Sequence, residues 1–154
     1  MVDTGQLEQK ARDSFRIFSE GNTDEFSQYL ADDFTYRSTS GEEAHGPDGF
    51  IQFYRTYDEA FSNMSVTVEE VFPTGNNKVA VLYRQRGTHS GNLYGLEPSN
   101  NDMNVLGCNI ITFDDNGKMV DAYDIIDTLE VLKQLDALPG EVTEQLTLGG
   151  RPGA

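Results

Sequence analysis

Three aspartates in one short stretch are the residues whose types and spacing are best suited to chemistry. Residues 117–135 read GKMVDAYDIIDTLEVLKQL, a segment that begins as a strand and ends as a helix, with Asp121, Asp124 and Asp127 among apolar neighbours. A carboxylate that faces an apolar pocket is desolvated, which raises its pKa toward neutral pH and makes it a usable general acid or base. The question is therefore which of the three carboxylates faces such a pocket.

The period of the strand separates the three acids. Side chains alternate between the two faces of a strand unless a bulge shifts the alternation. One face would carry Met119, Asp121, Tyr123, Ile125 and Asp127, and the other Val120, Ala122, Asp124 and Ile126. We expect Asp124 to face away from the pocket and Asp121 to lie near the hairpin end, close to water.

Asp127 has two competing interpretations. It lies where the strand ends and the helix begins, and Asp127-Thr-Leu-Glu130 has the spacing of a capping box with Asp in place of Ser. This spacing predicts that Asp127 is a helix N-cap. In the other interpretation its carboxylate faces the pocket and transfers protons.

An aromatic stripe is the candidate for the wall of the pocket. Within a helix predicted over about residues 47–62, five aromatic side chains recur at helical spacing: Phe50, Phe53, Tyr54, Tyr57 and Phe61. Such a stripe forms either ordinary core or the lining of a cavity. The sequence leaves both alternatives open.

The only two histidines do not predict a metal site. His45 and His89 lie far apart, and neither has a partner at the short spacing typical of metal ligands. His89, in GTHSG at the end of a strand, is either a polar loop residue held by backbone hydrogen bonds or part of the pocket. His45 precedes a helix in a loop and is expected to face solvent.

Helices followed by a run of long strands must position these residues. We predict helices over 4–20, 23–30 and about 47–62, strands over 32–40, 65–72, 77–91 and 103–114, a hairpin at Asn116-Gly117, the strand that opens 117–135, and a closing helix from Leu129. This order predicts one α+β domain over residues 1–138, in which helices cover one face of a curved antiparallel sheet and leave a cone-shaped pocket. A tail with Gly and Pro, residues 139–154, is expected to lie loosely on the surface or to reach a partner.

The charge balance excludes several classes of partner. The chain has 26 acidic and 11 basic side chains and a formal net charge of −15, which repels phosphate backbones and anionic lipid, so we expect neither nucleic-acid nor membrane binding. The N-terminus lacks the features of a secretory signal and no long apolar run occurs, so a cytoplasmic location is expected. Cys108 is the only cysteine and lies in an apolar run, which is typical of a buried structural residue.

Several motifs in order resemble the SnoaL-like polyketide cyclase (ester cyclase) family of the nuclear transport factor 2-like superfamily, over about residues 5–136. The motifs are Ala60-Phe61-Ser62-Asn63, Gly87-Thr88-His89-Ser90-Gly91, Gly95-Leu96-Glu97-Pro98-Ser99, Asn116-Gly117-Lys118-Met119-Val120-Asp121 with Tyr123 and Asp127, and Gln134-Leu135. The resemblance implies an α+β barrel around a hydrophobic cone, a homodimer, and no metal or cofactor. It also implies that a pocket aspartate, here Asp127, is the general acid/base of an intramolecular aldol closure.

The chain departs from the pattern of this family at three places. Leu82-Tyr83 replaces a usual Arg-Trp pair, Tyr123 stands at a usual Trp, and Ala122 stands at a usual His. The hypotheses are therefore a cyclase or isomerase that acts on a small apolar carbonyl compound, or a non-catalytic module for ligand binding or dimerisation. A third is hydration or epoxide opening, with Asn109 holding a water. The side chains expected to bind a ligand are His89, Tyr123, Tyr83, Asn109, Phe53 and Tyr36.

The acid excess predicts a response of stability to salt. If the surface is adapted to a salty cytoplasm, screening of its self-repulsion should raise the melting temperature markedly in molar salt. Calorimetry in potassium chloride from low to molar concentration measures this. A flat melting temperature would identify an ordinary acidic surface.

Overall fold

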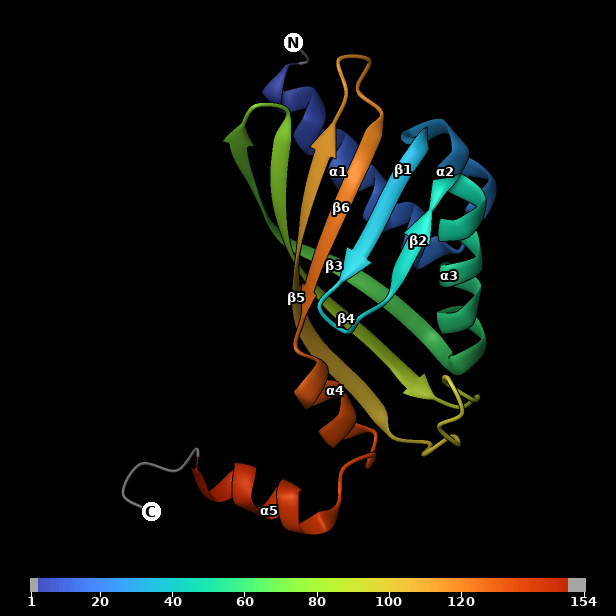
Figure 1. Ribbon diagram of the computed structural model, residues 1–154, viewed down its shortest axis with the longest axis vertical. Coiled ribbons are helices and arrows are strands. Elements are labelled where there is room, and N and C mark those ends of the chain that lie inside the picture. The colour runs from blue at the N-terminus through green and yellow to red at the C-terminus, as the bar shows by residue number, and fades with distance from the viewer. Residues whose placement is uncertain (1–2, 150–154) are drawn as a thin grey trace.

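Six strands form one strongly curved sheet in the computed structural model, which describes residues 3–149 (Figure 1). The helices are α1 (Thr4–Glu20), α2 (Thr23–Tyr29), α3 (Gly46–Ala60), α4 (Thr128–Gln134) and α5 (Gly140–Gly149). The strands are β1 (Leu30–Ser38), β2 (Glu43–His45), β3 (Phe61–Gly75), β4 (Lys78–His89), β5 (Asp102–Phe113) and β6 (Met119–Ile126). Their order across the sheet is β2-β1-β6-β5-β4-β3.

The sheet confirms the predicted α+β class but is mixed and open. Strands β3 to β6 form an antiparallel meander, whereas β1 pairs with β6 in parallel. The reason is the path of the chain: after β2, helix α3 carries it to the far edge, and the meander then returns across the sheet until β6 reaches β1. The predicted antiparallel arrangement is therefore confirmed for β3 to β6, and the parallel pair of β1 and β6 adds to it.

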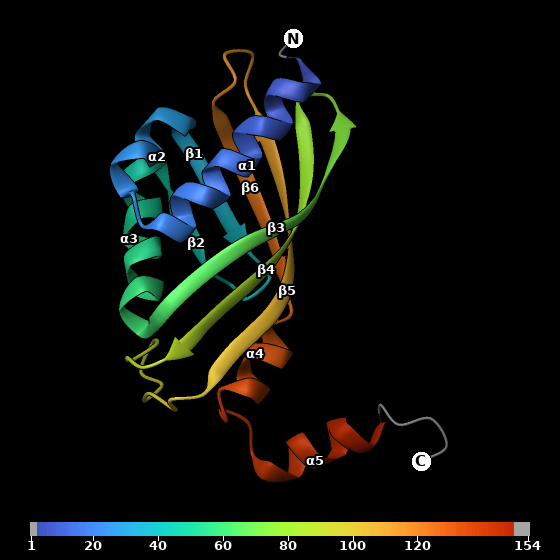
Figure 2. The same cartoon turned by 180° about the vertical axis from the view of Figure 1, so that it is seen from behind.

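Helix α1 lies across the concave face of the sheet, and α3 lies beside β1 (Figure 2). Helix α1 buries Leu7, Ala11 and Phe15, which recur at helical spacing, on the side that faces the sheet. Gly21 ends this helix in the left-handed conformation, φ 72°, that glycine adopts without a Cβ clash. Two helices on one side of a curved sheet leave the space in which the candidate site lies.

Three boundaries differ from the predictions. Strand β2 forms within a segment predicted to be loop, and β3 begins at Phe61 because the helix ends at Ala60. Helix α5 occupies part of the segment predicted to be a loose tail, and it stands away from the sheet in both views (Figures 1 and 2). No helix within residues 3–149 is long and apolar enough to cross a membrane.

Candidate active site

A bulge in β6 decides which aspartate faces the interior. Phe113 of β5 pairs with Met119, but the preceding Thr112 pairs with Asp121, so β6 contains one extra residue at this point. An extra residue reverses the alternation of the side chains that follow it. Asp124 is consequently buried, and our prediction that it faces away from the cavity was wrong.

Asp124 is held by two tyrosines from different strands. The hydroxyl of Tyr36 on β1 donates a hydrogen bond to Oδ2 at 2.9 Å, and the hydroxyl of Tyr83 on β4 donates to Oδ1 at 2.7 Å. Asp124 as a whole is 7% exposed. Burial raises the pKa of Asp124 from 3.8 to about 6, the two phenol donors oppose this rise, and the carboxylate of Glu42 adds to it.

The tyrosines beside Asp124 remain hydrogen-bond donors at all ordinary pH values. Burial and the charge of Asp124 raise the pKa of both Tyr36 and Tyr83 far above the usual value for a phenol. Their protons therefore stay on oxygen while Asp124 titrates. The pair fixes the position of the carboxyl group without competing for its proton.

Gly107 makes room for Tyr83. The two residues are cross-strand partners on β4 and β5, and the tyrosine ring lies across the glycine. A Cβ atom on Gly107 would lie 2.3 Å from both Cζ and the hydroxyl oxygen of Tyr83. Only glycine at this position allows the phenol to reach Asp124.

A cavity of about 90 Å³ lies in front of the carboxyl group, between the sheet and helices α1 to α3. Nine side chains form its aromatic lining: Phe15, Phe18, Phe26, Phe34, Tyr36, Phe50, Phe53, Tyr57 and Tyr83. The polar lining residues besides Asp124 are Ser14, Glu42, Gln85 and Asn109. The cavity therefore combines a large apolar surface with a few polar groups, which is typical of a small-molecule site.

Asn109 lies next to Asp124, because the two residues are cross-strand partners on β5 and β6. Its Oδ1 atom is buried and has no hydrogen-bond partner among the residues that the structure describes. Buried polar atoms are usually paired. This oxygen can therefore accept a hydrogen bond from a ligand in the cavity.

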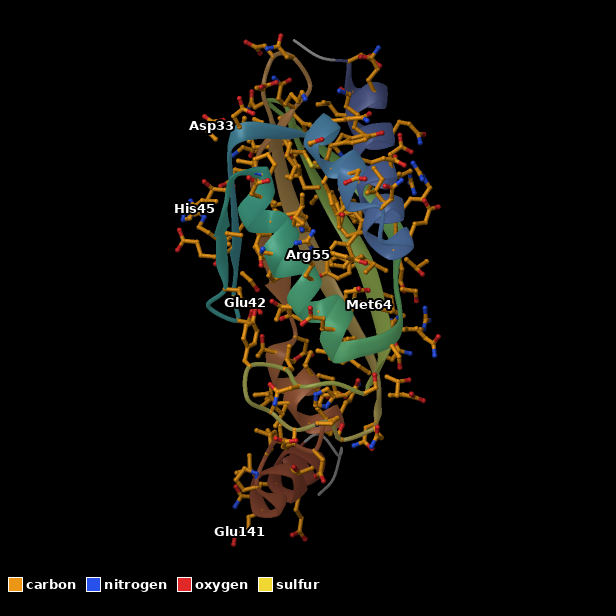
Figure 3. The ribbon with its side chains drawn as sticks, turned by 90° about the vertical axis from the view of Figure 1, so that its right-hand side faces the viewer. Asp33, Glu42, His45, Arg55, Met64 and Glu141 are labelled. Carbon is orange, nitrogen blue, oxygen red and sulfur yellow. The ribbon has the colours of Figure 1, made fainter. Side chains whose placement is uncertain are left out.

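Glu42 connects the β1–β2 turn to α3. The hydroxyl of Tyr57 donates a hydrogen bond to its Oε1 at 2.5 Å, and Glu42 lies beside α3 in Figure 3. This places a second carboxylate at the cavity. Glu42 was not among the predicted site residues, because it belongs to a segment predicted to be an ordinary loop.

Asp127 lies outside the cavity. It is exposed, and its Oδ1 accepts a hydrogen bond from the backbone N–H of Glu130 at 3.1 Å. Asp127 is therefore the N-cap of α4, as its spacing from Glu130 predicted. The alternative in which its carboxylate faces the pocket does not agree with this placement.

The structure brings four of the other predicted residues to the cavity: Tyr36, Phe53, Tyr83 and Asn109. Tyr123 is 37% exposed on the outer face of the sheet, where the guanidinium of Arg37 lies over its ring at 5.4 Å. The bulge in β6 explains why Tyr123 does not reach the cavity: it turns Asp124 inward, and the neighbouring Tyr123 therefore points to the outer face.

Neither histidine lines the cavity. His89 is fully buried but does not line the cavity, and its Nδ1 accepts a hydrogen bond from the backbone N–H of Ser99 at 3.1 Å. Its backbone also bonds to Asn100 and Asn101, so this residue holds the loop between β4 and β5. His45 is exposed beside Glu43, as predicted, and points away from the body of the protein (Figure 3).

The fold places the chain among α+β proteins with a curved sheet around a cavity, and comparison identifies the family. The model of the SnoaL-like polyketide cyclases matches residues 9–135. The chain therefore belongs to the SnoaL-like polyketide cyclase family. We found no significant match among curated protein sequences.

Solved structures show the same fold. TsrD from Streptomyces laurentii superposes with a TM-score of 0.79 at 20% identity, covering 90% of this chain and 100% of TsrD. IdmH from Streptomyces antibioticus gives a TM-score of 0.72 at 24% identity, covering 85% and 99% of the two chains. A protein of ketosteroid isomerase-like fold from Catenulispora acidiphila, in complex with trimethylamine, gives 0.67 at 17% identity, covering 81% and 89%.

The raised pKa of Asp124 predicts a pH dependence of stability. Because the folded protein holds this proton more tightly than the unfolded chain, the associated stabilisation is complete below about pH 3.8 and is lost as the pH rises through about 6. The difference between these pKa values corresponds to about 3 kcal/mol. Relative to Asp124→Asn, the free energy of unfolding of the natural chain should therefore fall by this amount between about pH 3.5 and about pH 8.

Urea unfolding at a series of pH values measures this difference. The control is Asp127→Asn, which replaces an exposed carboxyl group and keeps Asp124. The difference in unfolding free energy between this variant and the natural chain should not change by about 3 kcal/mol over the same pH range. A constant difference between the natural chain and Asp124→Asn across this pH range would show that Asp124 titrates normally.

Proposed function

We propose that this protein is a cyclase or isomerase in which Asp124 is the general acid/base for a small apolar carbonyl compound. The observation that carries the proposal is a buried carboxyl group, with a pKa near neutral, fixed by Tyr36 and Tyr83 at the wall of an apolar cavity. Membership of the SnoaL-like polyketide cyclase family supports this reaction class. In this proposal Asp124 takes the role that the family resemblance implied for Asp127.

The proposed reaction begins with removal of a proton. The carboxylate of Asp124 takes the proton from a carbon next to a carbonyl group, and the electrons of the C–H bond pass to the carbonyl oxygen, which becomes an enolate. The side-chain amide of Asn109, which lines the cavity beside Asp124, can donate a hydrogen bond to this oxygen. His89, which we expected to bind the ligand, does not line the cavity.

The enolate can then react within the same molecule. In a cyclase its carbon attacks a second carbonyl group, a C–C bond forms, and the new alkoxide receives the proton from Asp124. In an isomerase the proton returns to a different carbon. Both routes leave Asp124 ionised at the end, so they need no further reagent.

A non-catalytic role in binding is the second candidate. The aromatic lining and Asp124 are groups that could bind a ligand without any reaction. The Catenulispora protein of similar fold was solved in complex with trimethylamine, so this fold can hold a small molecule. This alternative predicts binding without turnover.

Exchange of substrate protons tests the catalytic proposal. The chain should accelerate hydrogen–deuterium exchange at the α-carbons of a small cyclic diketone, and the rate should rise with pH through about 6 as Asp124 ionises. Asp124→Asn should lower this rate by roughly 10²- to 10⁴-fold, because a general base contributes about that factor. NMR spectroscopy measures the exchange.

The matched control for exchange is Asp127→Asn. It makes the same chemical change three residues away, at a helix cap, and should leave the rate within about twofold of the natural value. Retention of activity in Asp124→Asn, or its loss in the control, would contradict the assignment to Asp124.

We also propose that a second copy of the chain covers the outer face of the sheet. Leu106, Tyr123 and Ile125 are 37%, 37% and 43% exposed there on the adjacent strands β5 and β6. Apolar side chains grouped on one face of a sheet are typical of an interaction surface. Their burial against the same surface of a partner would give a symmetric homodimer.

Light scattering after size-exclusion chromatography tests the homodimer. The natural chain should elute with twice the mass of one chain, and Ile125→Asp should shift it to monomer because a charge would be buried at the interface. The control, Phe72→Asp, changes a residue of equal exposure on β3 and should remain dimeric. A monomeric natural chain would refute the homodimer.

A further inference from the structure

We infer that the cavity selects small organic cations, such as tertiary and quaternary ammonium ions, over neutral molecules of the same shape. This inference concerns binding alone and goes beyond the proposed proton transfer. It rests on the charges and the aromatic groups that surround the cavity, and either proposal can hold without the other.

Every charged group that lines the cavity is an acid. Asp124 and Glu42 contribute carboxyl groups, and among the lining residues of the described chain there is no Lys, Arg or His. The charge of Glu42 makes ionisation of Asp124 harder. A cation between the two carboxylates would remove this repulsion, whereas a neutral ligand would leave it in place.

The arginines next to Tyr36 on β1 and Tyr83 on β4 form ion pairs away from the cavity. Arg37 lies on the outer face of the sheet and pairs with Asp121 at 3.2 Å, and Arg84 pairs with Glu69 at 2.8 Å. Both therefore have exposed acidic partners of their own. Neither arginine therefore supplies counter-charge to the buried Asp124, and a bound cation would supply it.

The aromatic lining specifies what kind of cation fits. The face of an aromatic ring attracts a cation through its quadrupole, and the attraction is stronger where water is excluded. A Mg²⁺ or Ca²⁺ ion instead needs about six to eight oxygen ligands, and this wall consists mainly of rings and aliphatic groups. An ammonium ion with alkyl substituents can contact the rings and approach a carboxylate at the same time.

The field of the whole protein acts in the same direction. A formal net charge of −15 raises the local concentration of cations near the protein and lowers that of anions. The long-range field draws cations toward the surface, and the two carboxylates then favour them inside the cavity. Salt should weaken the first effect more than the second.

The pH at which selection appears is set by the groups around Asp124. These are Tyr36 on β1, Tyr83 on β4, Tyr57 on α3, Glu42 at the β1–β2 turn and Cys108 on β5. Their phenol and thiol groups all have raised pKa values and stay neutral below pH 8. Ionisation of Asp124 is thus the change expected to strengthen cation binding as the pH rises through about 6.

Choline and 3,3-dimethyl-1-butanol provide the test, because the second is a neutral molecule of the same shape as the first. Isothermal titration calorimetry at about pH 8 should show choline bound at least about tenfold more tightly, and lowering the pH to about 5 should remove most of this preference. Equal binding of the two molecules, or binding of neither, would overturn the inference.

Variants distinguish this inference from the proposed function. Asp124→Asn and, separately, Glu42→Gln should each reduce the preference for choline, and Asp127→Asn should keep it. The pH comparison on the natural chain needs no variant, so the test survives if one of them fails to fold. A preference for choline without diketone exchange would refute only the proposed proton transfer, and exchange without a preference would refute only the inference drawn here.

Discussion

The burial of one carboxyl group, Asp124, is the constraint on which the rest of the site depends. Removing a carboxylate from water is costly unless hydrogen bonds compensate it, and here the two compensating donors come from two other strands. Tyr36 ties β1 to β6, and Tyr83 reaches across β5 from β4. The same two bonds therefore orient the carboxyl group and link three strands of the sheet, β1, β4 and β6.

The shape of the sheet makes this arrangement possible. Tyr83 can cross β5 only because Gly107 has no side chain, and Asp124 can face inward only because β6 carries an extra residue near its start. Both are local departures from a regular strand. They place one polar cluster at the wall of a cavity that is otherwise built from aromatic rings.

The sequence predicted the class of fold and much of the cavity wall, because these depend on periodic patterns. The buried residues of α1 and the aromatic residues of α3 follow the helical period, and four of the side chains expected to bind a ligand, Tyr36, Phe53, Tyr83 and Asn109, lie in the cavity wall. The resemblance implied a catalytic acid at Asp127, whereas we propose Asp124, because a single extra residue in β6 exchanges the two faces of the strand and no residue type marks a bulge reliably. Regular alternation along β6 placed Asp127 on the same face as Met119 and placed Asp124 on the opposite face. The bulge lies between Met119 and Asp124, so it reverses the face of Asp124 relative to Met119.

One signal in the sequence could still have favoured Asp124. Asp127 had a complete local explanation as a helix cap, with Glu130 at the right spacing, whereas Asp124 lies inside a strand between apolar residues and has no local partner. An acid without a local partner in an apolar strand must find one across the sheet. Tyr36 and Tyr83 are such partners, and only the three-dimensional structure brings them together.

The two proposals for the cavity are connected through the proton of Asp124. A cation bound near this group would stabilise the carboxylate and lower its pKa, and by linkage an ionised Asp124 would bind the cation more tightly. A cationic carbonyl compound would thus keep more of the base ionised at neutral pH, but would also make it a weaker base. If both proposals hold, the substrate would carry a positive charge that moves away from the carboxylate, or is dispersed over the aromatic lining, as the proton is transferred.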